Sequence, residues 1–294
     1  MKIFGVLPVA DGTLARVARL GLGWKTGELL ASTTGDEFWM ASWAKDTDIG
    51  GARAAFPETR PSAVLGARSD DPLARARAFA ILVSAYWKPV YRSIRIRFGK
   101  SNEDAKDLTQ DFFTHALERE MFASFDPGRA RFRVFVRGCL RNFVLNAETQ
   151  RRRIKRGGGA ITLSLDFEQA ERELELLADP DASLEDAFDR DLAKQIEALA
   201  VAELEGELAS KGKANYFKIF QRYDLKPDDE RPTYGELAEE LDLKVTDVTN
   251  HLAYVRRRLR QIVLSKLREI TVSDEEFREE AREMLGIEID PRPS

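Results

Sequence analysis

Apolar residues recur at helical spacing along most of the chain, and several of the predicted helices carry start or stop signals. The run Asp70-Asp71-Pro72 predicts a helix start, because an acidic cap followed by proline suits a first turn. We expect Pro89 to kink or divide this helix, because proline lacks the N–H that a helix interior uses. The apolar face of this helix is formed by Phe79, Leu82, Val83, Tyr86, Val90, Tyr91, Ile94 and Phe98.

Two more helices are predicted in the first half of the chain. Gly99 ends the preceding helix, and Ser101 is a suitable cap for a new one with apolar positions from Ala105 to Leu117. A third helix is predicted from about 131 to 146, with arginines on the face opposite its apolar residues. The apolar residues of this third helix are Phe132, Phe135, Val136, Leu140, Phe143 and Val144.

The second half of the chain begins after three consecutive glycines, at 157–159. The acidic stretch that follows, to about 185, predicts a partly ordered linker. Helices are expected at about 184–208 and 214–223. These three features divide the chain into two helical modules.

A helix-turn-helix pattern follows in the second module. Thr233 and Glu236 have the spacing of a capping box, which predicts a helix start. A short turn at 242–244 leads to a second helix with a nearly unbroken apolar seam from Val245 to Ile262. The outward face of this helix carries Thr246, Asp247, Thr249, Asn250, Tyr254, Arg256, Arg257 and Arg260. Short hydrogen-bonding side chains followed by arginines suit insertion into a DNA major groove.

These patterns predict an all-α protein with two helical domains joined by an acidic linker. Residues 1–56 show no sustained period and are left as an unassigned N-terminal extension. The first domain is expected at 57–156, the linker at 157–185 and the helix-turn-helix domain at 186–268. An acidic C-terminal extension at 269–294 completes the chain, and we expect it to cover the basic helix before a partner binds.

Composition excludes several classes of protein. The chain has 294 residues, of which 33% are charged, with only 19 Gly and 11 Pro, which argues against collagen-like or low-complexity sequence. One cysteine and two histidines leave no disulfide framework and no Cys-rich metal site, so no metal and no cofactor are predicted. We find no run near the roughly 20 apolar residues that cross a bilayer. We therefore expect a cytoplasmic protein with no membrane span.

The net charge of −4 conceals strong segregation. Residues 129–158 hold ten Lys and Arg against the single acid Glu148, whereas residues 166–210 are predominantly acidic. A second basic block at 256–268 precedes the acidic extension. Two basic modules therefore flank an acidic connector, as expected of a protein that binds a polyanion such as DNA.

The order of these motifs resembles bacterial RNA polymerase sigma factors. The segment EDAKDLTQDFF at 103–113, followed by FRVFVR at 132–137 and LRNF at 140–143, resembles region two of that family. Residues 233–264 resemble region four, and the layout without an intervening domain is similar to the extracytoplasmic-function class. The SLDF linker and the acidic extension resemble a subgroup that has a C-terminal extension.

The resemblance implies that the chain is a transcription initiation factor with no catalytic residues. It implies a helix that docks on the β′ clamp of core RNA polymerase, with further contact to the β subunit, through Asp104, Asp107, Leu108, Gln110, Asp111 and Phe112. The three aspartates also share one helix face by spacing, beside an aromatic residue that would act as an anchor. Promoter DNA is the second implied partner, and an anti-sigma factor is a third.

By the same resemblance, the basic helix would hold the melted minus-ten element. The implied residues are Arg133, Arg137, Arg141, Asn142, Asn146, Arg151, Arg152 and Arg153. Amides can read base edges while arginines bind the backbone. Phe132, Phe135 and Phe143 lie at helical spacing, which favours a place in the core over base stacking. The outward face of the second helix of the helix-turn-helix would bind the minus-thirty-five element.

Two other functions fit parts of the sequence. A helix-turn-helix regulator that acts without polymerase needs only the second module, and a metal-dependent DNA-processing enzyme would use Asp104, Asp107 and Asp111 with a divalent ion. No Walker loop, dinucleotide fingerprint or nucleophile elbow supports an enzyme. His251 would contact phosphate or pack, with packing favoured, and Cys139 fits a small buried side chain better than a redox sensor.

Overall fold

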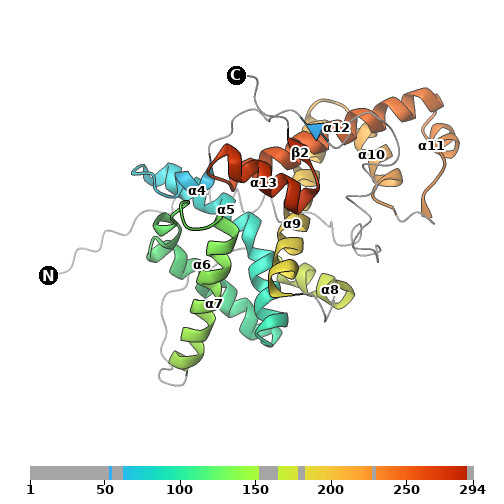
Figure 1. Ribbon diagram of the computed structural model, residues 1–294. Helices are drawn as coiled ribbons and strands as arrows, with labels where there is room; N and C mark the ends of the chain where they lie inside the picture. The colour runs from blue at the N-terminus through green and yellow to red at the C-terminus, as the bar shows by residue number, and fades with distance from the viewer. Residues whose placement is uncertain (1–52, 55–61, 152–164, 178–182, 227–229, 290–294) are drawn as a thin grey trace.

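The computed structural model describes five stretches of the chain, and all but the first are mainly helical (Figure 1). The described residues are 53–54, 62–151, 165–177, 183–226 and 230–289. The predicted all-α class is confirmed at the level of mainly helical structure. The N-terminal extension predicted at 1–56 lies outside the described residues except for Arg53 and Ala54.

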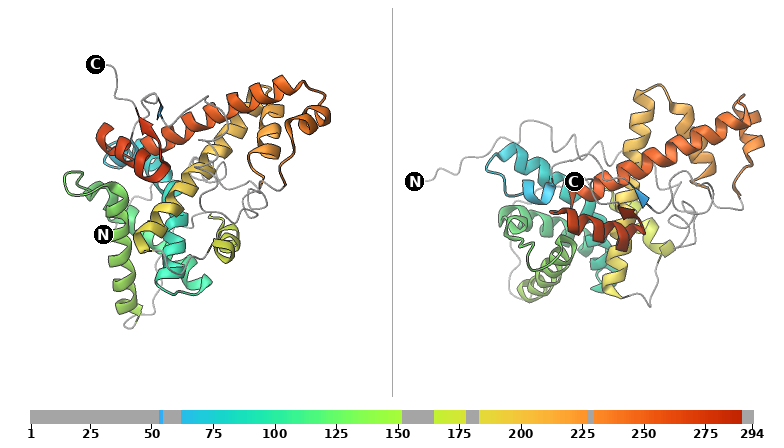
Figure 2. Two further views of the ribbon diagram at one scale, coloured as in Figure 1. Left: turned by 45° about the vertical axis from the view of Figure 1, so that its right-hand side comes forward. Right: turned by 45° about the horizontal axis from the view of Figure 1, so that its top comes forward.

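The described elements are helices, except for one short strand at each end of their order (Figures 1 and 2). In chain order they are β1 (Arg53–Ala54), α4 (Ala63–Gly66), α5 (Pro72–Arg92), the π-helix η1 (Ser93–Arg97), α6 (Asn102–Glu118), the 3₁₀ helix η2 (Met121–Ser124), α7 (Phe132–Arg151), α8 (Phe167–Leu177), α9 (Leu184–Ser210), α10 (Ala214–Tyr223), α11 (Tyr234–Glu240), α12 (Val245–Glu269), α13 (Asp274–Leu285) and β2 (Glu288–Ile289).

Helix α5 begins as predicted, because the Asp71 carboxylate accepts hydrogen bonds from the backbone of Leu73 and Ala74. The expectation that Pro89 divides the helix is wrong, since α5 continues through it to Arg92. The irregularity comes after the proline, where α5 widens into η1 and the backbone N–H of Phe98 donates to Ser93. The buried surface of α5 supports this continuity, because packing can compensate for the hydrogen bond that proline omits.

Aromatic side chains form much of the core between α5, α6 and α7. The Phe132 ring is fully buried and contacts Tyr86 edge-on, with 5.6 Å between ring centroids. Phe112 and Phe143 join α6 to α7 in the same way, with their centroids 5.6 Å apart. The phenylalanines of α7 thus lie in or against the core, as the helical spacing favoured.

Part of the predicted linker is a packed helix. The ring of Phe167, at the start of α8, lies against both Trp87 and Tyr91 of α5. Glu171 of α8 then accepts a hydrogen bond from the Tyr91 hydroxyl at 2.6 Å and pairs with Arg95. The acidic composition of this stretch concealed an amphipathic helix that tertiary contacts hold in place. Residues 157–164 and 178–182 of the predicted linker lie outside the described residues.

Helix α9 lies between the two basic modules and packs against both (Figure 2). Its first half contacts α5, where Asp191 pairs with Arg92 at 2.6 Å and the Gln195 amide donates to the Ser84 carbonyl at 2.8 Å. Its second half contacts α12, where Glu203 pairs with Lys266 at 2.6 Å. The boundary predicted at 186 falls within the first turn of α9, which begins at Leu184 and packs against both modules.

The helix-turn-helix forms as the capping pattern predicts. The Thr233 hydroxyl accepts from the Glu236 backbone N–H, and the Glu236 carboxylate accepts from the Thr233 N–H at 2.7 Å. Asp242 turns the chain after α11 with a φ of 52°, and the Leu243 N–H closes the turn on Ala238 at 2.8 Å. α11 packs on α12, and α10 packs on α12 beside it.

The acidic C-terminal extension also folds. Ser273 caps α13, whose buried face consists of Phe277, Ala281, Met284 and Leu285. Gly286 ends the helix with a φ of 62°, and β2 then pairs in parallel with β1 over two residues. Figure 1 shows α13 beside α12 and above α7, so α13 lies against the first basic module.

Candidate nucleic-acid interface

The outward face of α12 is polar and accessible, as predicted. Its apolar seam, from Val248 to Ile262, is buried against α9, α10 and α11, whereas Val245, which was predicted to begin the seam, is 47% exposed. On the opposite side, Thr246, Asn250 and Arg257 are exposed. Partly exposed positions complete the predicted minus-thirty-five set: Asp247, Thr249, Tyr254, Arg256 and Arg260. Hydrogen-bonding groups therefore lead at the N-terminal end of this face, and Arg257 follows.

Several members of this predicted set are held by bonds within the protein. The Arg256 guanidinium makes a two-point contact with the Asp224 carboxylate, at 3.0 and 2.7 Å. In this structure the nearly buried Asp224 takes the charge of Arg256, and the assignment of Arg256 to DNA stays a prediction. Asp247 accepts from the Lys244 backbone, and Thr249 donates to the Thr246 carbonyl at 2.9 Å. Burial lowers the pKa of Arg260.

His251 packs rather than projecting outward. Its ring stacks on Tyr216 of α10, with 3.7 Å between the ring centroids and 23° between their planes. Burial lowers the pKa of His251, and the nearby charge of Lys213 lowers it further, although Asp247 opposes the shift. The histidine therefore contributes an aromatic surface rather than a positive charge at neutral pH. The packing favoured by the sequence is what the structure shows.

The second candidate surface is the C-terminal half of α7. Arg141, Asn142 and Asn146 are all exposed and share one side of the helix. Leu145 is 48% exposed among them, so an apolar side chain interrupts an otherwise polar face. Arg151 ends the helix, with its side chain outside the described part of the chain, as are Arg152 and Arg153.

The N-terminal half of α7 is arranged differently from the prediction. Arg133 is only 9% exposed, and its guanidinium pairs with Glu283 at 2.8 Å and with Asp189. Its Nε also lies 3.0 Å from Glu280, as an ion pair without hydrogen-bond alignment. Arg137 is partly buried and pairs with Asp189 at 3.0 Å. Carboxylates of α9 and α13 therefore neutralise both arginines in this structure, and their assignment to DNA stays a prediction.

The carboxylates of α13 bind the first turn of α7 as a group, which we term the α13 clamp: Glu276, Glu279, Glu280 and Glu283. Glu276 accepts from the buried backbone N–H of Phe132 at 3.0 Å and from the Val272 N–H at 2.7 Å. Glu279 pairs with Arg131 at 2.9 Å. Such carboxylates complement the N–H groups that have no partner within the helix, and the positive end of the helix dipole, at the start of α7.

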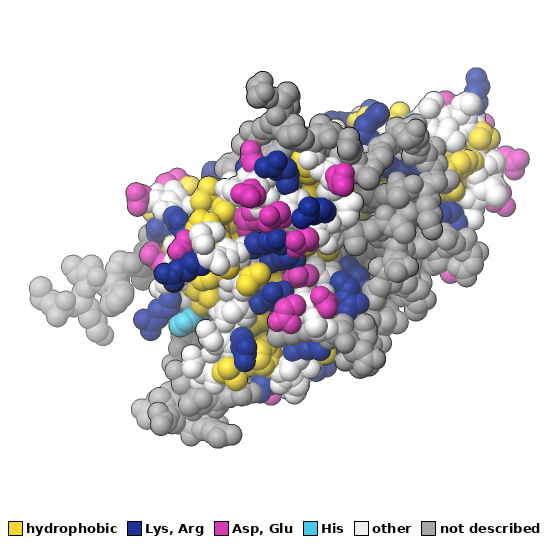
Figure 3. Space-filling model, in the orientation of Figure 1, with side chains coloured by type: hydrophobic (Ala, Val, Ile, Leu, Met, Phe, Trp, Pro, Cys, Tyr) yellow, Lys and Arg dark blue, Asp and Glu magenta, His cyan; other side chains and the backbone are white. Residues whose placement is uncertain are grey.

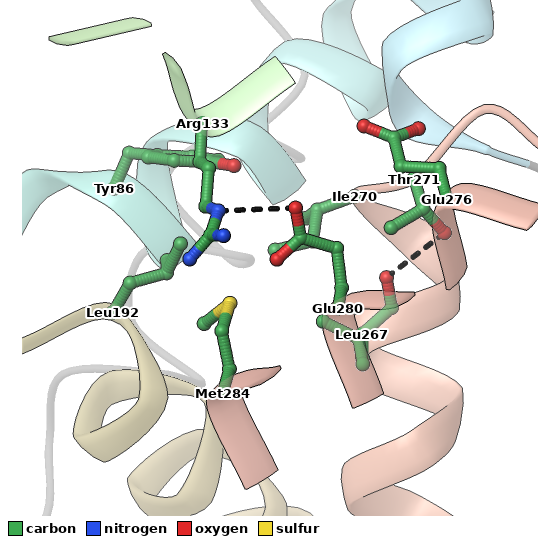
Figure 4. A pocket seen from close by; sticks show the side chains of 9 residues that line it. All are labelled: Tyr86, Arg133, Leu192, Leu267, Ile270, Thr271, Glu276, Glu280 and Met284. Carbon is green, nitrogen blue, oxygen red and sulfur yellow. Dashed lines mark hydrogen bonds and ion pairs between the residues drawn. The ribbon is translucent and has the colours of Figure 1, made fainter. Parts of the chain in front are cut away.

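A small cavity lies behind the clamp, between α7, α9, α12 and α13 (Figure 4). Arg133 and Glu280 point toward each other across it, and Tyr86, Leu192 and Met284 close its sides. Burial raises the pKa of Glu280 to about 7, even though Arg133 and Arg131 lower it. Burial also raises the pKa of Tyr86 well above its usual value. The clamp thus holds a carboxyl group that titrates close to neutral pH.

The C-terminal segment that carries the clamp is part of the folded core rather than a loose cover. Phe277, Met284, Leu285 and Ile287 are all nearly or fully buried. Burial of such side chains stabilises a fold by roughly 1.5–3 kcal/mol each. We expected the acidic extension to cover the basic helix, and it does reach Arg131 and Arg133. It leaves Arg141 and its neighbours on α7 exposed. Figure 3 shows basic and acidic side chains interleaved on this face.

The residues of α6 that were predicted to bind polymerase differ in burial. Asp107 and Asp111 are exposed, and Asp104 and Gln110 are partly exposed. Leu108 and Phe112, by contrast, are in the core, with Phe112 fully buried. The Phe112 ring is therefore not available as an anchor in this structure, because it is fully buried and packs against Phe143 of α7. The carboxylates remain accessible along one side of the helix.

Sequence reasoning missed α13 as an interaction element, although a signal was present. Ser273 and Glu276 have the spacing of a capping box, and the apolar residues that follow recur at helical intervals.

The sequence favours a small buried side chain at Cys139. It is half-buried, and burial raises the pKa of its thiol to about 11. The thiolate that reacts with oxidants is therefore scarce at neutral pH.

Two searches within the described residues bear on other classes of function. Among these residues, no group of three or more His, Cys, Asp and Glu side chains has a geometry that could hold a metal ion. None of the described helices is long and apolar enough to cross a bilayer.

Comparison with known proteins leaves the family of the chain open. A scan against protein-family models, a search of curated proteins and a search of solved structures each found no match.

Proposed function

We propose that this protein is a transcription initiation factor that directs core RNA polymerase to promoters. The observation that carries the proposal is the accessible outward face of α12, the second helix of the helix-turn-helix, which follows the capped helix α11. Thr246 and Asn250 precede Arg257 on that face, so base-reading groups lead and a phosphate-binding group follows. In this role α12 binds duplex DNA at the minus-thirty-five element.

A second contact with DNA is assigned to α7. Its exposed residues Arg141, Asn142 and Asn146 combine one cation with two amides, which suits a single strand with separated bases. We assign minus-ten binding to these three residues and exclude Arg133, whose charge the α13 clamp neutralises. Leu145 offers an apolar contact for a base within the same surface.

The contact with polymerase is assigned to the carboxylates of α6. Asp107 and Asp111 lie one turn apart on an exposed helix side, where they can meet basic residues of a partner. With Leu108 and Phe112 in the core, this contact is mainly electrostatic and should weaken with salt. The core-forming residues of α6 would then position the carboxylates rather than touch the polymerase.

Co-purification with bacterial core RNA polymerase tests this proposal. The full chain is expected to bind core enzyme, and Asp107→Arg is expected to abolish binding by placing like charges together. Glu168→Arg is the matched control, because Glu168 is an exposed carboxylate on α8, outside the proposed contact. Equal binding of wild type and Asp107→Arg would contradict the assigned contact. No binding by the wild type, together with tight duplex binding, would favour a helix-turn-helix regulator that acts alone.

A further inference from the structure

Two tyrosines and a lysine meet where α10 packs on α12. The ammonium of Lys213 lies 4.1 Å from the centroid of the Tyr254 ring and 5.2 Å from that of Tyr216. The two tyrosine rings contact edge-on, with their centroids 5.6 Å apart, and His251 stacks on the Tyr216 ring. One cation is therefore held against two aromatic rings at the junction of these helices.

The backbone also fixes the position of Lys213. Gly212 adopts a φ of 68°, which allows the chain to turn sharply between α9 and α10. The Lys213 N–H then donates to the Leu208 carbonyl at 2.8 Å. A lysine that is held at both its backbone and its ammonium loses less freedom when it binds a ligand than a free surface lysine does.

The ammonium retains hydrogen-bonding capacity. A ring face attracts the charge but does not accept three N–H groups at once. Lys213 has no hydrogen-bond acceptor or carboxylate partner among the residues that the structure describes. In this respect it differs from Lys211, which pairs with Glu207 at 2.7 Å, and from Lys266, which pairs with Glu203. Its side chain is partly exposed, so an anion can reach it.

The cluster adjoins the proposed duplex-binding face. Tyr254 lies four residues after Asn250 and three before Arg257, so the three side chains share one side of α12. Lys213 rests on Tyr254 and thus lies at the edge of that side. Burial lowers the pKa of His251, so Lys213 is the main positive charge of this cluster.

We propose that Lys213, held between Tyr216 and Tyr254, is a preorganised phosphate contact that extends the duplex-binding surface from α12 onto α10. The inference rests on the proposed function and adds a residue outside the helix-turn-helix. A phosphate contact fixes register and orientation without reading sequence. Lys213 should therefore strengthen binding to any duplex, whereas Asn250 should affect only the choice of sequence.

The test measures the affinity of the full chain for a random-sequence duplex as a function of salt. Lys213→Met keeps the aliphatic stem and removes the charge. The association constant falls as salt rises, and in this variant the magnitude of the slope of log K against log salt is expected to decrease by about 0.9, the value for one phosphate contact. Lys213→Arg should preserve the slope. Lys218→Met is the matched control, because Lys218 is an exposed lysine on the same helix.

Three results would overturn the inference. An unchanged slope in Lys213→Met, with wild-type duplex binding intact, would show that Lys213 only joins α10 to α12. A lower melting temperature in Lys213→Met with an unchanged slope would support the same structural role. Absence of any salt-dependent duplex binding by the wild type would remove both the inference and the assignment of α12 to DNA, whereas failure to bind polymerase alone would leave the inference standing.

Discussion

Replacing Phe277 with alanine tests whether α13, the helix that carries the clamp, belongs to the folded core. The Phe277 side chain is fully buried on the inner face of α13, with the Arg268 guanidinium over its ring at 5.7 Å. Removing a buried phenyl ring costs about 3–5 kcal/mol, because both the burial and the packing around the resulting cavity are lost. For a chain of this size, that loss corresponds to a decrease in melting temperature of roughly 6–20 °C.

Thermal unfolding monitored by circular dichroism would measure this decrease. In a chain with Trp24, Trp39 and Trp43 replaced by Phe, fluorescence of the buried Trp87 would report on the first module. Leu73→Ala is the matched control, because Leu73 is 63% exposed and its loss should change stability little. The account expects Phe277→Ala to shift both transitions together, since α13 binds α7. A melting temperature equal to that of the control, together with tighter DNA binding, would refute this reasoning and identify α13 as a removable cover.

Three further predictions concern single side chains. Stability should fall as pH rises from about 4.5 to about 7, by up to about 1.4 kcal/mol per pH unit, because folded Glu280 holds its proton to a pKa of about 7 whereas the unfolded carboxyl releases it near 4.5. Urea titrations should show this slope reduced in Glu280→Gln, and an identical slope would be inconsistent with the raised pKa. Arg141→Ala should weaken single-stranded DNA binding several-fold in fluorescence anisotropy, whereas Arg282→Ala, at an exposed position on α13, should not; equal effects would remove α7 from the mechanism. Cys139 should react with iodoacetamide more slowly than free cysteine at neutral pH, because its pKa is raised to about 11, and reaction at the free rate would contradict its burial.

Local signals predicted the helices well where the chain carries its own caps. Thr233 and Glu236 set the start of α11, and Ser101 set the start of α6, because each cap bonds backbone groups within three residues. Helix α8 was missed because its order depends on Phe167 meeting Trp87 and Tyr91, which are remote in sequence.

The sequence predicted which residues lie on the helices of the candidate site, but not which of their side chains are exposed to a partner. Sequence spacing placed Arg133 and Arg141 on the same basic helix, and both are there. Only the fold shows that Arg133 is paired with carboxylates of α9 and α13, whereas Arg141 is exposed. Likewise, the spacing that placed Phe112 beside the aspartates of α6 could not distinguish a partner-binding ring from a core ring.

The most direct test of the account is transcription in vitro with purified bacterial core polymerase and a library of promoter fragments. We expect defined start sites that depend on this protein and disappear with Asp107→Arg, while Glu168→Arg retains them. We also expect that Arg257→Ala, at an exposed position on α12, reduces initiation at those sites. Transcripts that are the same with and without the protein would contradict the central claim.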